Sequence, residues 1–217
     1  LIRMVTAGQY NLENYLLELE NAFNAFEEEF GNPDVRVMAL SLRDDIFQIP
    51  YKRNNGDELR DDERVNQFRA RLKDVKLLDS RGYLTLPFST QLKDLSPLTR
   101  NHKIRHVEVE LQGGQLGDGV ARIYLRMSGT GVVKNVSDAT DYYVFPERTA
   151  VVNASIGGSK VFDPEVYRNY RFRDRPLVNT LWELIINQRD ELANRDINLG
   201  TLNDIRVLIY YSDFTTF

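Results

Sequence analysis

The sequence predicts a mainly β protein, an antiparallel β-sandwich preceded by one N-terminal amphipathic α-helix. Residues 11–30 carry leucine and phenylalanine at helical spacing, whereas beyond Pro33 apolar residues recur at every second position. These alternating runs are short and are separated by turn residues, which is typical of sandwiches. With 42% hydrophobic residues, including 11 Phe and 11 Tyr, the 217-residue chain can bury a substantial core.

The net charge and the amino-acid composition exclude several classes of function. A net charge of −4 and a pI near 5.4 provide no basic field, so we expect no nucleic-acid partner. The absence of cysteine excludes disulfides and thiol chemistry. No run of apolar residues is long enough to predict a transmembrane segment. Localisation stays open, with secretion or export without a visible signal peptide as one reading.

The helix predicted at residues 11–30 carries its apolar side chains on one face. Asn11 is a plausible N-cap, Gly31 supplies a left-handed stop and Pro33 prevents continuation. The spacing of 4, 3, 4, 3, 4 is that of a coiled-coil seam. The seam residues are Leu12, Leu16, Leu19, Phe23, Phe26 and Phe30.

Two alternatives follow for this helix. It packs on its own domain, or it is the end of a longer helix and takes part in a homo-oligomer. We interpret the chain as a fragment with two parts: a helix and connection at 1–33, and a β-sandwich domain at 34–217.

The strands are predicted where apolar residues alternate. Val35, Val37 and Ala39 alternate through residues 35–42, and the polar run 52–64 indicates a loop. A short helix is predicted from the spacing of Val65 through Val75. Strands then follow at Tyr83–Phe88, Lys103–Leu111, Val120–Gly129, Tyr142–Phe145, Ala150–Ala154, Leu181–Asn187 and Ile205–Tyr211, with a turn at Asp118–Gly119.

No pattern indicates catalysis, a cofactor or a metal. His106 is expected in a strand and His102 in the loop before it, so their spacing does not form a helical metal site. The glycine-rich residues 113–119 lack the Lys-Ser/Thr ending of a phosphate loop. Carboxylate pairs stand beside arginines, where ordinary ionisation is expected. They are Asp44 with Asp45, Asp61 with Asp62, and Asp138 with Asp141.

Aromatic and arginine residues gather between residues 142 and 173. This composition is typical of a binding patch for protein or for sugar rings, and it also suits side chains that cover a sandwich edge. Loop carboxylates Asp138, Asp141 and Asp163 leave a calcium-assisted lectin as an alternative function. The candidate binding residues are Tyr142, Tyr143, Phe145, Tyr170, Arg171 and Arg173.

Four segments, taken in order, resemble the C-terminal region of the A component of Tc (toxin complex) insecticidal toxins. They are GYLTLPFS at 82–89, HKIRHVEVEL at 102–111, FRDRPLVNTLWELII at 172–186 and LNDIRVLIYYSDF at 202–214. Trp182 and Asp204 fall on family positions, as does Tyr210 or Tyr211. The sequence departs from the family at the glycine-rich residues 113–119 and at Arg175, Leu177 and Val178.

The resemblance implies a β-sandwich beyond the pore-forming helices of a pentameric subunit, within the platform that binds the other toxin components. We therefore expect a non-catalytic protein-binding and assembly module of a larger toxin-like complex. The alternative is a carbohydrate-binding, lectin-like sandwich.

Overall fold

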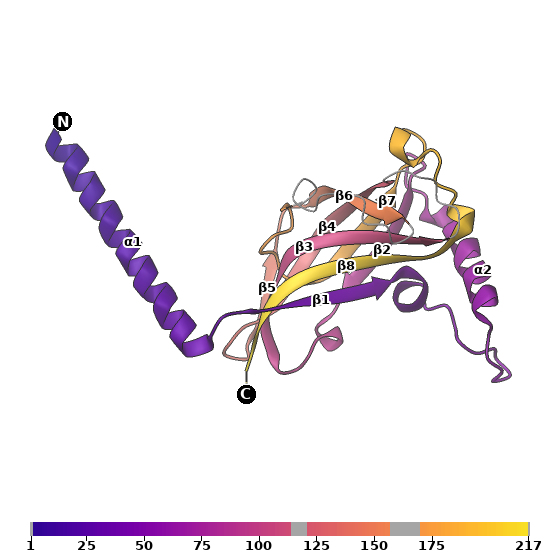
Figure 1. Cartoon of the computed structure of the whole chain (residues 1–217), viewed down its shortest axis with the longest axis horizontal. Helices are drawn as coiled ribbons and strands as arrows, with labels where there is room; N and C mark the ends of the chain where they lie inside the picture. Colours follow the sequence, from indigo (N-terminus) through magenta and orange to yellow (C-terminus); the bar gives the residue numbers. More distant parts are fainter. Residues whose placement is uncertain (1, 114–120, 157–169, 217) are drawn as a thin grey trace.

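The computed structural model describes residues 2–113, 121–156 and 170–216. Helix α1 (Ile2–Phe30) projects away from a β-rich body (Figure 1). It begins nine residues before the predicted N-cap Asn11, because residues 2–10 contain no proline to interrupt it. As predicted, Gly31 ends it: its φ is +72°, and its amide donates to the Glu27 carbonyl at 2.8 Å.

Within the described residues, eight strands form the body. In hydrogen-bonding order they run β1-β8-β3-β6-β4-β7-β2, and β5 pairs with β4 outside this path. Their bounds are β1 Asp34–Ser41, β2 Leu84–Thr90, β3 Thr99–Gly113, β4 Ala121–Lys134, β5 Thr140–Val144, β6 Arg148–Ile156, β7 Val178–Ile186 and β8 Leu202–Thr215.

The strands form two packed layers, one of three strands (β1, β8, β3) and one of five (β2, β7, β4, β6, β5). This confirms the predicted sandwich. One pairing departs from the antiparallel prediction, since β3 and β6 run parallel where Val109–Leu111 face Ala154–Ile156. That short ladder joins the two layers, so the hydrogen bonding continues from one layer into the other.

The core lies between the layers. On β4, Ala121, Ile123, Leu125 and Met127 are buried, as their alternation predicts. Trp182 of β7 is fully buried; its ring stacks on Phe88 with centroids 6.0 Å apart and meets Phe172 edge-on at 5.2 Å. Aromatic packing therefore fixes β2 and the segment before β7 against the same side chain.

Strand β1 turns its two valines toward solvent. Val35 and Val37 are 70% and 49% exposed, whereas Met38 is buried. Leu42, directly after the strand, is fully buried. Because side chains alternate along a strand, Met38 and Leu40 then face the core and the odd-numbered residues face solvent. An apolar pair is left on the outer face of the three-stranded layer.

Two helical turns follow β1. A π-helix at Leu42–Ile46 was not predicted; it is capped by Ser41, whose Oγ accepts from the Asp44 amide at 2.9 Å. The predicted short helix is α2 (Asp61–Leu72), with Phe68 and Leu72 buried. It begins inside the predicted loop 52–64 because acidic residues at 61–63 favour a helix N-terminus.

The other helical segments in the described part of the chain are single turns at Val75–Leu77, Leu92–Asp94, Leu192–Asn194 and Leu199–Thr201. Within the residues that the structure describes, no helix combines the length and apolarity needed to cross a membrane. The turn predicted at Asp118–Gly119 and the family departure at 114–119 lie outside the described residues.

Candidate binding surfaces

The seam of α1 is largely uncovered. Leu12, Leu16, Leu19 and Phe23 are each between 56% and 67% exposed. Among the described seam side chains, Phe26 alone is partly buried, and its ring meets Phe214 edge-on with centroids 5.3 Å apart. The side chain of Phe30 is outside the described residues. The expectation that this seam packs on its own domain is therefore wrong for its first four residues.

The aromatic–arginine patch is built from β5 and the residues after it, together with the turn before β7. The rings of Tyr143 and Phe145 stack with centroids 5.9 Å apart. The Arg175 guanidinium lies 5.1 Å from the Phe145 ring, and Lys103 Nζ lies 5.7 Å from Tyr143. The Arg175 contact therefore links the two segments, and the Lys103 contact joins β3 to β5.

Backbone contacts also tie these segments together at one end of the sandwich. Arg171 Nη1 donates to the Thr149 carbonyl at 3.0 Å, and Arg148 Nη1 donates to the Arg171 carbonyl at 3.2 Å. Arg173 lies over the Tyr170 ring at 5.4 Å. Five of the six predicted residues thus gather near one end of the fold, around β5, the start of β6 and the turn before β7.

Tyr142 is the exception. It alternates with Tyr143 along β5, so it points from the opposite face of that strand, where it is 71% exposed. Val144 shares that face and is also exposed. The predicted patch therefore divides into a packed group around Tyr143 and a separate apolar pair on the back of β5.

Lys103 and Arg175 belong to the patch but were missed in the sequence. Burial lowers the pKa of Lys103, against the opposing effect of Asp174. Burial also lowers the pKa of Arg175, and the nearby Arg148 adds to this. Arg175 is one of the residues that depart from the family pattern, and that departure was the signal that could have identified it. Of the other aromatic and arginine residues in this region, Tyr167 and Arg168 lie outside the described residues.

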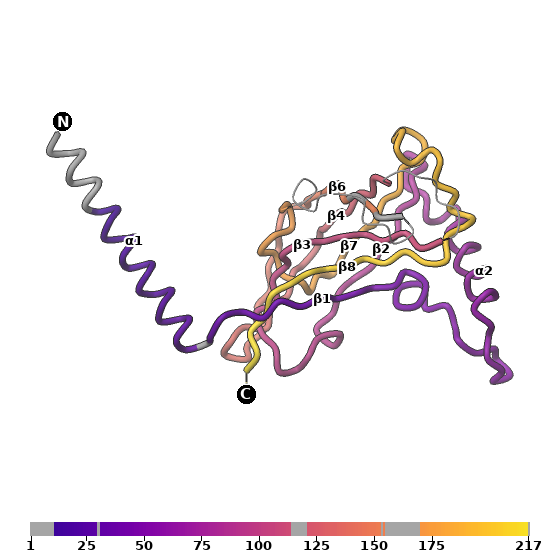
Figure 2. Tube along the Cα trace, viewed as in Figure 1, coloured from indigo at the N-terminus to yellow at the C-terminus, as the bar shows by residue number. Residues whose placement is uncertain are grey.

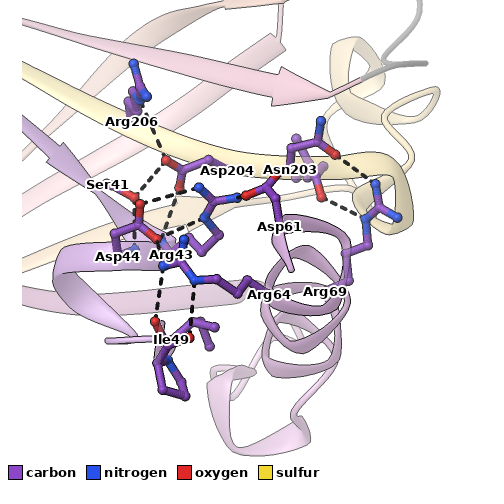
Figure 3. Close-up of polar contacts among 12 residues, drawn as sticks. Ser41, Arg43, Asp44, Ile49, Asp61, Arg64, Arg69, Asn203, Asp204 and Arg206 are labelled. Carbon is purple, nitrogen blue, oxygen red and sulfur yellow. Dashed lines mark hydrogen bonds and ion pairs between the residues drawn. The ribbon is translucent and has the colours of Figure 1, made fainter. Parts of the chain in front are cut away.

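A polar cluster lies at the other end of the three-stranded layer, where the π-helix, α2 and β8 meet (Figure 3). Arg64 is buried, and its Nη2 donates to Asp44 Oδ1 at 2.6 Å and to the Ile49 carbonyl at 3.2 Å. Burial opposes ionisation of Asp44, but Arg43 and Arg64 outweigh it and lower its pKa. The carboxylates of this cluster are paired with arginines within it, and these contacts support the fold.

Asp204, a residue that carries the family resemblance, joins this cluster to β8. Its carboxylate accepts from Ser41 Oγ at 2.7 Å and from the Arg43 amide at 3.0 Å (Figure 3). It also accepts from the Ile205 amide at 2.8 Å. It is 3% exposed. Because its partners lie on β1, the π-helix and β8, Asp204 fixes the end of β1 to β8.

The described residues contain no group of three or more His, Asp and Glu that could hold a metal ion. Asp138 pairs with Lys134 at 2.8 Å and also with Arg100, while Asp141 accepts from Asn135 at 2.9 Å. Asp163 lies outside the described residues. The two described carboxylates considered for calcium therefore have protein partners.

The histidines are placed differently from the prediction in one respect. His106 lies in β3 as expected, but His102 also lies in β3 and is buried, because Asn101, with φ +55°, begins a bulge there. Thr99 Oγ1 donates to the Ser96 carbonyl, so His102 Nε2 donates to Thr99 Oγ1 at 2.7 Å. Burial, followed by nearby cations, lowers the pKa of His102 to about 4.

No protein-family model matches the chain, and no curated protein matches it. Among solved structures, 92% of the chain matches TcdA4 of Morganella morganii, with 16% identity and a TM-score of 0.49. The same share matches the TcaA–TcaB structure of Yersinia pseudotuberculosis, with 15% identity and a TM-score of 0.46. The match covers 8% of the first of those chains and 11% of the second.

The fold and its surfaces define a β-sandwich with a projecting apolar helix. In fold, the chain is similar to a small portion of the large A components of Tc toxins.

Proposed function

We propose that this chain is a non-catalytic protein-binding and assembly module of a larger, toxin-like complex. The observation that carries the proposal is the uncovered seam of α1. The helix itself extends away from the sandwich (Figures 1 and 2). Exposure of four large apolar side chains to water is unfavourable, and their burial against another helix would lower the free energy. We therefore assign α1 the role of joining copies of this chain through a helical bundle.

The aromatic–arginine patch supplies a second contact surface in this proposal. Tyr and Arg are enriched among the residues that dominate binding energies, and here the Arg175 and Lys103 side chains are held against aromatic rings. A rigid patch loses little conformational entropy when a partner covers it. We propose that a different protein of the complex binds there.

The arrangement of the acidic residues supports a non-catalytic role. Asp44 is paired with Arg43 and Arg64, and Asp61 is paired with Arg43 at 3.0 Å. A general acid of the glycosidase type needs a carboxyl whose pKa is raised in an open cleft. Asp44 does not meet that requirement, because its pairing with arginines lowers its pKa.

Sedimentation of the whole chain at increasing concentration tests the helix assignment. We expect concentration-dependent oligomers that are lost when Leu16 and Leu19 are both changed to Glu. The matched control changes Asn14 and Asn21 to Glu, which adds the same charge on the exposed polar face of the helix. A chain that stays monomeric, or oligomers that survive L16E/L19E, would contradict the proposal.

A further inference from the structure

A groove lies between the two strands that end the hydrogen-bonding order. β1 is the last strand of the three-stranded layer and β2 is the last strand of the other. A cavity of about 620 Å³ is lined by Met38–Leu40 of β1 and by Pro87–Ser89 of β2. The polar residues Asp45 and Asp94 lie on its two sides. We call this cavity the β1–β2 groove.

Among the described strands, β1 pairs with β8 alone, so its other edge is open to a further strand up to Ser41. The Ser41 amide donates to Asp45 Oδ2 at 2.7 Å, so it points away from β8. Because amides alternate along an antiparallel strand, those of Val35, Val37 and Ala39 point the same way. Such a row of free donors and acceptors is a template for another strand.

Strand β2, on the opposite side of the groove, is less able to form backbone hydrogen bonds with an added strand. Pro87 lies in the middle of β2 and has no amide hydrogen, so it interrupts the outer edge of that strand. Phe88 is buried beside it and, with Met38, gives the groove an apolar floor. An extended segment would therefore hydrogen-bond to β1 and only pack its side chains against β2.

The charges of the groove indicate the composition of that segment. Asp45 and Asp94 are both exposed, and the described ion pairs include no basic partner for either one. The third carboxylate of the lining, Asp44, is already paired with Arg43 and Arg64, and Lys93 is the one cation among the described residues of the lining. A lysine or arginine on the entering segment would meet the carboxylates on the two sides.

We propose that the β1–β2 groove binds an extended segment of a partner protein, which adds as a strand to β1 and places a basic side chain between Asp45 and Asp94. Main-chain hydrogen bonds supply most of the affinity in this mode, and alternate side chains supply specificity. About seven residues would span the open part of the edge, at about 3.3 Å each. This surface is independent of the α1 seam and of the aromatic–arginine patch.

The test uses blocked seven-residue peptides of alternating valine and threonine with a central lysine, titrated into the ¹⁵N-labelled whole chain. We expect saturable shifts of the Val37 and Ala39 amide signals. A central glutamate, or N-methyl groups on alternate peptide amides, should weaken binding at least tenfold. Asp94→Asn should weaken the lysine peptide more than the glutamate peptide.

The protein-side control changes one position in two ways. Ala39→Pro removes the outward amide without removing a bond to β8 and should abolish the shifts, whereas Ala39→Thr keeps the amide and should bind normally. Emission of the buried Trp182 confirms that both variants fold. The absence of shifts in β1, or equal binding of the lysine, glutamate and N-methyl peptides, would overturn the proposal. The peptide comparison needs no variant to fold.

Discussion

Phe26 of α1 and Phe214 of β8 meet edge to face, with ring centroids 5.3 Å apart and planes at 85°. This contact ties the end of the projecting helix to the sandwich across the connection Gly31–Pro33. It sets the direction in which the rest of α1 leaves the domain.

A double-mutant cycle measures the strength of this contact. We expect Phe26→Ala and Phe214→Ala to show a coupling free energy of about 0.5–1.5 kcal/mol in urea unfolding. Phe23→Ala is the control, because its side chain is exposed and should not couple to Phe214. A coupling near zero would show that α1 is not held by this pair.

Asp204 should be among the most sensitive polar positions of the chain. Asp204→Asn removes one of the two acceptor oxygens that serve Ser41, Arg43 and Ile205. We expect a loss of about 1.5–3 kcal/mol in the free energy of unfolding, since hydrogen bonds to a charged group are involved. Asp196→Asn, at an exposed position, should change the free energy by less than about 0.5 kcal/mol.

The pair of Asp213 and Arg36 predicts a pH dependence. Asp213 is fully buried, and burial raises its pKa although Arg36 lies 3.0 Å away and opposes this. The folded state therefore holds the proton more tightly than the unfolded state. The stability from this group is complete below the ordinary carboxyl pKa and falls as pH rises through the raised value.

Urea unfolding at a series of pH values tests this prediction against Asp213→Asn, which cannot ionise. We expect the wild-type chain to lose stability relative to the variant as pH rises from about 4. A difference that grows in the opposite direction would show that Arg36 outweighs the cost of burial.

His102 predicts the opposite slope. Its pKa of about 4 lies below the ordinary value of 6.5, so the unfolded state binds the proton first. The stability that it contributes is present above pH 6.5 and is lost as pH falls toward 4. The loss should reach at most about 3 kcal/mol and should be absent in His102→Gln. Equal acid sensitivity of both proteins would exclude His102 as the cause.

Much of the sandwich could be predicted from local alternation. On β4, alternate residues from Ala121 to Met127 face the core, as the sequence pattern predicts. A strand with one buried and one solvent-exposed face requires apolar residues at every second position. The alternation in β1 did not reveal which face is buried, because valines occupy its solvent side. The deciding residue was Leu42, whose burial depends on a π-helix that no simple period reveals.

The parallel β3–β6 ladder could not be predicted for a different reason. Val109 and Ala154 are brought together by the closure of two layers, and no local pattern encodes that contact. The candidate patch was found by composition, but composition cannot tell which side of a strand a residue occupies. Tyr142 was therefore grouped with Tyr143, although the two point in opposite directions.

The pairing of β1 with β8 affects the order in which the chain can fold. Asp34 lies opposite Asp213, so β1 cannot pair with β8 until the residues between the two strands have been synthesised. Contacts so distant in sequence close slowly. During synthesis, β1 therefore remains without the strand that it pairs with in the native fold, and we expect this stage to be the one most prone to aggregation or to require a chaperone.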